Sequence, residues 1–267
     1  MVRGGPLVGL VGQVVVLAAL DGTIGIGIDG WLVGLAYGLV TAVALTVGIR
    51  IHVSGVPVSG RTPSCAEMPR KASFLTPSVL TSGLRYADWV TLVRATLVGG
   101  IAALVIHGLY SEVPVAPLVA IASVALALDA VDGWVARRTG TASPLGARFD
   151  MEVDAFLILV LSVSVAPRLG AWVLAIGAMR YAYVVAGWAL PWLRRPVPPR
   201  YWRKVVAAVQ GITLTAVTSG LFPASVCVAA VAVALGLLIE SFGRDVVWQW
   251  RHRRARVRKD ALLTPGA

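Results

Sequence analysis

The chain has 267 residues, of which 57% are hydrophobic and only 14% are charged. A soluble domain carries about 25% charged residues, so this composition excludes an ordinary soluble enzyme, a disordered tail and a fibrous repeat. The net charge of +11 comes from basic residues in short polar segments between apolar blocks, which favours membrane topology and lipid headgroups over a nucleic-acid partner. We therefore expect an all-α polytopic integral membrane protein.

Apolar blocks long enough to cross a bilayer follow one another along the chain. A spanning helix needs about 20 mostly apolar residues. The sequence contains eight such blocks, at about 6–20, 30–49, 88–108, 113–135, 149–167, 170–191, 205–221 and 224–242. Arg3 provides only a weak positive region ahead of the first block, so we expect that block to be a membrane helix and not a cleavable signal peptide.

Composition divides the chain into four parts. Segment 50–87 is rich in Ser, Pro and Gly, which is typical of a linker. We expect two transmembrane helices at 1–49, a cytoplasmic linker and juxtamembrane segment at 50–87, a six-helix core at 88–243 and a basic cytoplasmic tail at 244–267.

Basic residues are concentrated in alternate loops. Most of the Arg and Lys lie in segments 50–87, 137–148 and 192–204 and in the run RHRRARVRK at 251–259, whereas the loops near 21–29, 109–112, 168 and 222–224 contain one Arg between them. Cytoplasmic loops carry an excess of positive charge. We therefore expect a multi-pass cell-membrane protein with both termini and every basic loop in the cytoplasm.

Acidic residues gather between two of the expected helices. The chain has 13 acids, and five of them fall within 129–154. Asp129 and Asp132 are spaced i, i+3, and Asp150 and Asp154 are spaced i, i+4, so each pair shares a helix face. Carboxylates this close repel unless protons or cations neutralise them. Hard oxygen ligands without nearby His or Cys favour Mg²⁺, Mn²⁺ or Ca²⁺ over zinc.

Two other interpretations of these acids are ion pairs with neighbouring arginines and a proton or cation path in a transporter. The spacing favours a third. Residues 129–154 read DAVDGWVARRTGTASPLGARFDMEVD, which resembles the D-x2-DG-x2-AR-x8-G-x3-D-x3-D motif of the CDP-alcohol phosphatidyltransferase family. Every fixed position of the motif matches: Asp129, Asp132, Gly133, Ala136, Arg137, Gly146, Asp150 and Asp154.

The resemblance implies a six-helix core to which two N-terminal helices have been added. It also implies an enzyme of phospholipid synthesis that transfers a phosphatidyl group from CDP-diacylglycerol to a small polar alcohol and releases CMP. Two divalent cations, Mg²⁺ or Mn²⁺, would be held by Asp129, Asp132, Asp150 and Asp154, with Asp154 also acting as the base. The expected nucleotide contacts are Asp129, Asp132, Gly133, Ala136, Arg137 and Gly146. The resemblance further implies a homodimer.

The acceptor alcohol is less well defined by the sequence. Bacterial family members with a phosphorylated acceptor commonly have Lys or Arg after the last motif Asp, where this chain has Ala155. The candidates for acceptor binding are Arg148, Arg180, Arg200 and Lys204. Arg148 could instead pair with Glu152. Arg180 lies within an apolar helix, where an Arg is costly and indicates function, although pairing or snorkelling would also explain it.

The direction of transfer and the function class each have an alternative. An aminoalcohol-type phosphotransferase would use a soluble CDP-alcohol as donor and a lipid hydroxyl as acceptor, and the motif is compatible with both directions. A transporter would move cations or protons without releasing CMP. One further stretch, from Asp88 to Arg94, resembles the N-x-L-T-x-x-R sequence that often opens the family's first core helix, with Asp88 in place of the usual Asn.

Overall fold

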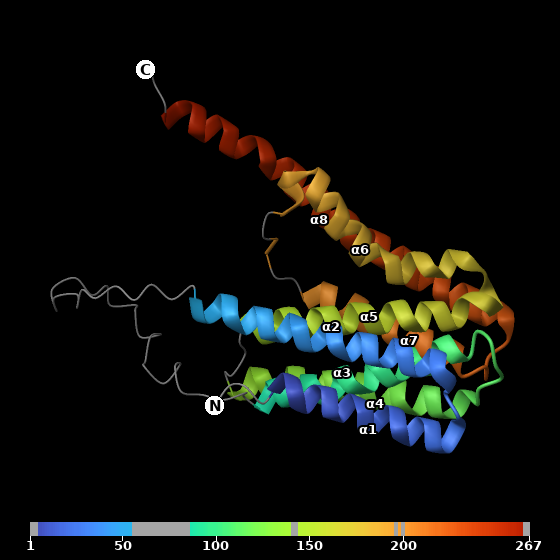
Figure 1. Ribbon diagram of the computed structural model, residues 1–267. Coiled ribbons are helices and arrows are strands. Elements are labelled where there is room, and N and C mark those ends of the chain that lie inside the picture. Colours follow the sequence, from blue (N-terminus) through green and yellow to red (C-terminus); the bar gives the residue numbers. More distant parts are fainter. Residues whose placement is uncertain (1–4, 55–85, 140–143, 195–196, 199–200, 264–267) are drawn as a thin grey trace. The chain divides into compact units, whose positions relative to one another are not determined.

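The computed structural model describes residues 5–54, 86–139, 144–194, 197–198 and 201–263 (Figure 1). Within these ranges the side chains of 48–54, 86–88, 132, 134–139, 144–145, 194 and 253–263 are not described. The expected linker at 50–87 therefore lies almost entirely outside the described residues.

The described residues form α-helices and two short 3₁₀-helices, with no strand among them, which confirms the all-α fold. The α-helices are α1 (Gly5–Ile24), α2 (Gly27–Ser54), α3 (Tyr86–His107), α4 (Val115–Thr139), α5 (Pro144–Leu169), α6 (Leu174–Ala189), α7 (Tyr201–Thr218) and α8 (Ala224–Leu263). The 3₁₀-helices are η3 (Ala171–Val173) and η4 (Pro191–Arg194).

Five segments in the described part of the chain are long and apolar enough to cross a membrane. They are Gly5–Ile24, Gly27–Val47, Trp89–His107, Ala171–Ala189 and Ala224–His252. A shorter apolar stretch, Val115–Val131, lies in α4, ahead of the charged residues with which that helix ends. The chain is therefore a multi-pass membrane protein.

Several helices extend beyond the apolar blocks that predicted them. α4 continues to Thr139 and α5 begins at Pro144, so the joining turn expected at 137–148 contains only four residues. Pro is favoured in the first turn of a helix, which accounts for this start of α5. α8 runs to Leu263 instead of ending near 242, because the basic run consists mainly of good helix formers without Gly or Pro.

The chain divides into two compact units, Met1–Ala103 with Ala127–Val153, and Leu104–Leu126 with Asp154–Ala267. In the first unit, α1 and α2 pack as a helical pair (Figure 1). They meet at a tight turn where Gly25 and Gly27 have positive φ values of 75° and 63°, a conformation that glycine adopts without strain.

α1 also packs on α3 within the first unit. Gly100 leaves room for α1, because a Cβ there would lie 2.9 Å from Val16. Gly99 faces the amide of Gln13, a residue of α1 that is only 1% exposed. Small residues let membrane helices approach closely. The two N-terminal helices are therefore packed against the helix that opens the core.

In the second unit, α6 packs closely on α5, and a hydrogen bond joins α7 to α8. Gly177 of α6 sits against α5, because a Cβ there would lie 2.5 Å from the Cα atom of Leu159. Gln210 Nε2 of α7 donates to the carbonyl oxygen of Ala234 in α8 at 2.7 Å. Unpaired polar groups are costly inside a membrane protein, so these interior bonds favour one arrangement of the helices.

Candidate active site

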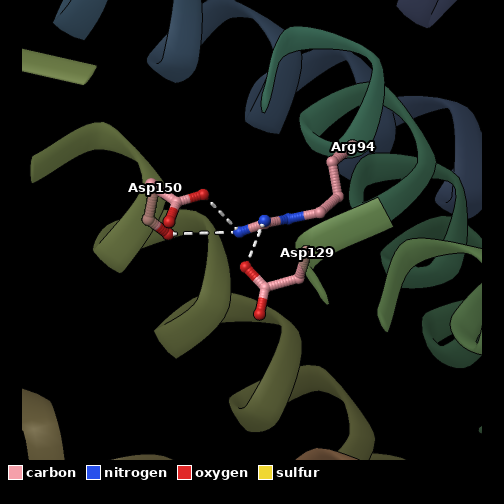
Figure 2. A network of polar contacts seen from close by, with 3 residues as sticks. All are labelled: Arg94, Asp129 and Asp150. Carbon is pink, nitrogen blue, oxygen red and sulfur yellow. Dashed lines mark hydrogen bonds and ion pairs between the residues drawn. The ribbon is translucent and has the colours of Figure 1, made fainter. Parts of the chain in front are cut away.

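Three helices of the first unit each contribute one charged side chain to a common cluster. Arg94 lies in α3, Asp129 in the second half of α4 and Asp150 in the second turn of α5. Arg94 Nη1 lies 2.6 Å from Asp129 Oδ1, and Arg94 Nη2 lies 2.7 Å from Asp150 Oδ1. Nη2 also donates to the Asp150 backbone oxygen at 3.4 Å. Figure 2 shows the guanidinium between the two carboxylates.

The members of this cluster differ in their exposure. The Arg94 side chain is fully buried, whereas those of Asp129 and Asp150 are 42% and 32% exposed. A fully buried guanidinium needs paired carboxylates, because an uncompensated buried charge is strongly destabilising. The carboxylates thus face the buried cation on one side and stay accessible on another.

Asp154 follows Asp150 by one turn of the continuous helix α5. One carboxylate oxygen of each of Asp129, Asp150 and Asp154 lies within 4.8 Å of the other two. Three carboxylates at this spacing supply the hard oxygen ligands that Mg²⁺ and Mn²⁺ prefer. The residues therefore fit a divalent cation, and the i, i+4 spacing of the sequence explains why two of the ligands share a helix face.

The other motif positions fall on the same two helices. Gly133 and Gly146 are partly buried, in α4 and α5 respectively. Asp132, Ala136 and Arg137 lie on the helical backbone of α4, but their side chains are outside the described set. Their proposed contacts with metal or nucleotide stay predictions.

The candidates for acceptor binding are dispersed over three elements. Arg148 is exposed in α5, Arg180 is partly buried in α6, and Lys204 is exposed in α7. Arg200 lies outside the described residues. The predicted acceptor contacts of these four residues are not tested by the geometry. Glu152 is exposed on α5.

Arg94 is the cluster member that the sequence did not assign to the site. In the sequence, Arg94 belongs only to the stretch that resembles the opening of a core helix, 35 residues before Asp129 and 56 before Asp150. The available signal was its position in an apolar helix, because a charged residue there is costly and usually functional. Its two partners could not be read from spacing, since they lie on other helices.

Comparison with known proteins agrees with the motif. The model of the family described as CDP-alcohol phosphatidyltransferase matches residues 84–238, which include α3 to α7 and the first part of α8 and leave out the two N-terminal helices. Searches of curated proteins and of solved structures found no match. Because the matched segment covers more than half of the 267 residues and contains the clustered aspartates, the chain belongs to the CDP-alcohol phosphatidyltransferase family.

Proposed function

We propose that this protein transfers the phosphatidyl group of CDP-diacylglycerol to the hydroxyl of a small polar alcohol, with release of CMP. Family membership establishes a membrane transferase that acts with a CDP-alcohol. The observation that carries the finer proposal is the cluster of Asp129, Asp150 and Asp154, whose carboxylate oxygens lie within 4.8 Å of one another. A substrate pyrophosphate needs such a site, because its charge has to be neutralised as the phosphoanhydride breaks.

The proposed reaction is a substitution at the phosphorus that bears the diacylglycerol. The acceptor oxygen forms a bond to this phosphorus, the bond to the CMP oxygen breaks, and the hydroxyl proton passes to a carboxylate. We assign that proton to Asp154, which is partly buried on α5. A carboxylate base contributes most when its environment brings its pKa towards the working pH.

Asp129, Asp150 and Asp154, with the motif's Asp132, would hold the divalent cations. Bound Mg²⁺ or Mn²⁺ would supply charge neutralisation for the pyrophosphate and for the CMP leaving group. Gly133 and Gly146 would let the backbone approach the nucleotide, because glycine has no side chain. Arg137 would offer a forked donor to phosphate oxygens.

The proposed orientation places this chemistry in the cytoplasm. The positive-inside distribution of Arg and Lys supports cytoplasmic termini and loops. The motif lies on α4 and α5, on either side of segment 140–143, and Arg137, Arg138 and Arg148 flank that segment in the sequence. The acceptor would therefore enter from the cytoplasmic side, where Arg148 and Lys204 could attract an anionic alcohol.

A donor panel tests the proposal. Purified protein in lipid, with Mg²⁺ or Mn²⁺, should release CMP from CDP-diacylglycerol when a small polar alcohol is supplied. CMP release only from a soluble CDP-alcohol in the presence of diacylglycerol would instead support the aminoalcohol-type direction. Metal or proton flux in proteoliposomes without CMP release from either donor would contradict the transferase proposal.

A further inference from the structure

Arg94 provides the acidic cluster with a positive charge that belongs to the protein itself. Its guanidinium lies 2.6 Å and 2.7 Å from carboxylate oxygens of Asp129 and Asp150, which come from different helices (Figure 2). Two carboxylates at one site repel each other. The guanidinium offsets that repulsion whether or not a divalent cation is bound.

We infer that Arg94 is a resident counter-ion of the metal site: it keeps Asp129 and Asp150 together before metal binds, and its charge lowers the affinity of the cluster for the metal. This inference rests on the proposed function, because it takes the three clustered aspartates as metal ligands. It adds a positioning residue that acts on the ligands and not on the substrate.

The guanidinium and a metal can be bound by the same carboxylates. Each carboxylate has two oxygens with about four acceptor positions, and Arg94 lies against the Oδ1 atom of each partner. The partners are 42% and 32% exposed, so part of each carboxylate is accessible. Arg94 can therefore keep its place while a cation binds to the accessible part.

The charge of Arg94 is permanent. An arginine side chain does not lose its proton in proteins, and this one is fully buried within the apolar span Trp89–His107. A fixed positive charge so close to the ligands repels a divalent cation. Arg94 thus lowers the affinity of the site for metal but keeps its carboxylates together before metal binds.

Thermal unfolding of the full-length protein across a Mn²⁺ titration tests the inference. In Arg94→Gln the metal-free melting temperature should fall, because the carboxylates lose their counter-ion. The difference in melting temperature between the variant and the wild type should become smaller at saturating Mn²⁺. Half-saturation of the variant should occur at a Mn²⁺ concentration lower by about fivefold or more, since the repelling charge is gone.

Two further variants separate this role from general stabilisation. Arg203→Gln removes an arginine of α7 that is paired with Asp245 of α8, and it should lower the melting temperature by the same amount with and without Mn²⁺. Arg94→Lys keeps the charge but cannot form the same fork. The stabilisation by Mn²⁺ should increase in the order wild type, Arg94→Lys, Arg94→Gln.

The outcomes distinguish this inference from the proposed function. Equal Mn²⁺ stabilisation of wild type and Arg94→Gln overturns the inference, even if the wild type releases CMP. If Arg94→Gln does not fold even in Mn²⁺, equal stabilisation of wild type and Arg94→Lys overturns it in the same way. Absence of CMP release from every donor, with the predicted order of Mn²⁺ stabilisation intact, overturns the transferase proposal and leaves the counter-ion role supported.

Discussion

At the scale of single residues, the proposed active site combines a buried cation with accessible anions. Arg94 is fully buried, whereas its partners Asp129 and Asp150 are partly exposed. In the proposed function, the neighbouring acids have different roles. A carboxylate that touches both the guanidinium and a metal would be a positioning ligand, whereas we assign the proton transfer to Asp154.

Asp129→Asn should weaken the binding of Mn²⁺ and of CDP-diacylglycerol together. The substitution removes one ligand charge, and the affinity of oxygen-ligand sites depends on their charge count. We expect the dissociation constant for Mn²⁺ to rise on the order of tenfold or more. Glu152→Gln, on an exposed position of the neighbouring helix α5, is the matched control and should bind Mn²⁺ nearly as the wild type does. Equal weakening in both variants would contradict the assignment of Asp129 as a ligand.

At the scale of helices, packing depends on a few positions where no side chain fits. Gly177 of α6 is the clearest, because the atom nearest to an added Cβ is the Cα atom of Leu159 at 2.5 Å. Backbone atoms cannot rotate away as a flexible side chain can. Gly236 of α8 differs, because an added Cβ would meet nothing within 4 Å.

Gly177→Ala should therefore destabilise the contact between α5 and α6. Overpacking a well-packed interior costs about 1–3 kcal/mol. Gly236→Ala should leave the free energy of unfolding unchanged or raise it slightly, since Ala is the better helix former. Unfolding in mixed micelles measures both variants against the wild type. A Gly177→Ala protein as stable as Gly236→Ala would show that the two helices do not approach as described.

α8 is a second helix whose contacts with other helices should contribute to stability. Its 40 residues are about twice the number needed to span a bilayer. Polar bonds link its central part to other helices: Trp202 Nε1 of α7 donates to Glu240 at 2.9 Å, and Tyr183 Oη of α6 donates to Gln249 at 2.7 Å. Asp245 pairs with Arg203 of α7 and is only 7% exposed.

Asp245→Ala should thus cost more stability than Arg244→Ala. Asp245 forms a partly buried pair between helices, and hydrogen bonds to charged groups contribute about 1.5–3 kcal/mol. Arg244 pairs with Glu240 within α8, and both side chains are exposed, so that pair should contribute little to stability because solvent screens it. Equilibrium unfolding of the two single variants compares them directly. Similar losses would mean that Asp245 does not connect α7 with α8.

At the scale of the whole molecule, the sequence predicted what depends on local pattern. Long apolar runs predicted the eight helices, and the fixed gaps of the motif predicted that Asp150 and Asp154 share a helix face. The pairing of Arg94 with two distant aspartates and the burial of Gln13 against Gly99 were not predicted, since both depend on which helices become neighbours. The full length of α8 was not predicted for another reason. The apolar block ends near residue 242, whereas the residues after it, including the basic run at 251–259, still favour a helix.

The membrane topology can be checked with the two native cysteines. Cys65 lies in the linker expected to be cytoplasmic, whereas Cys227 is buried near the start of α8. A membrane-impermeant maleimide should label Cys65 in inside-out vesicles and leave it unlabelled in right-side-out vesicles. Cys65→Ser should abolish the labelling. Labelling of Cys65 from the outside would reverse the proposed orientation.

The central claim is that the clustered aspartates perform phosphatidyl transfer, with Asp154 as the base. The most direct measurement compares wild type and Asp154→Asn for CDP-diacylglycerol binding and CMP release across a Mn²⁺ titration. Asn keeps the size and one ligand oxygen but cannot accept the proton. Asp154→Asn should retain much of its CDP-diacylglycerol binding while its turnover falls by about 10²–10⁴-fold at every Mn²⁺ concentration. Recovery of the full rate at high Mn²⁺ would show that Asp154 is only a ligand and would contradict the assignment of the base.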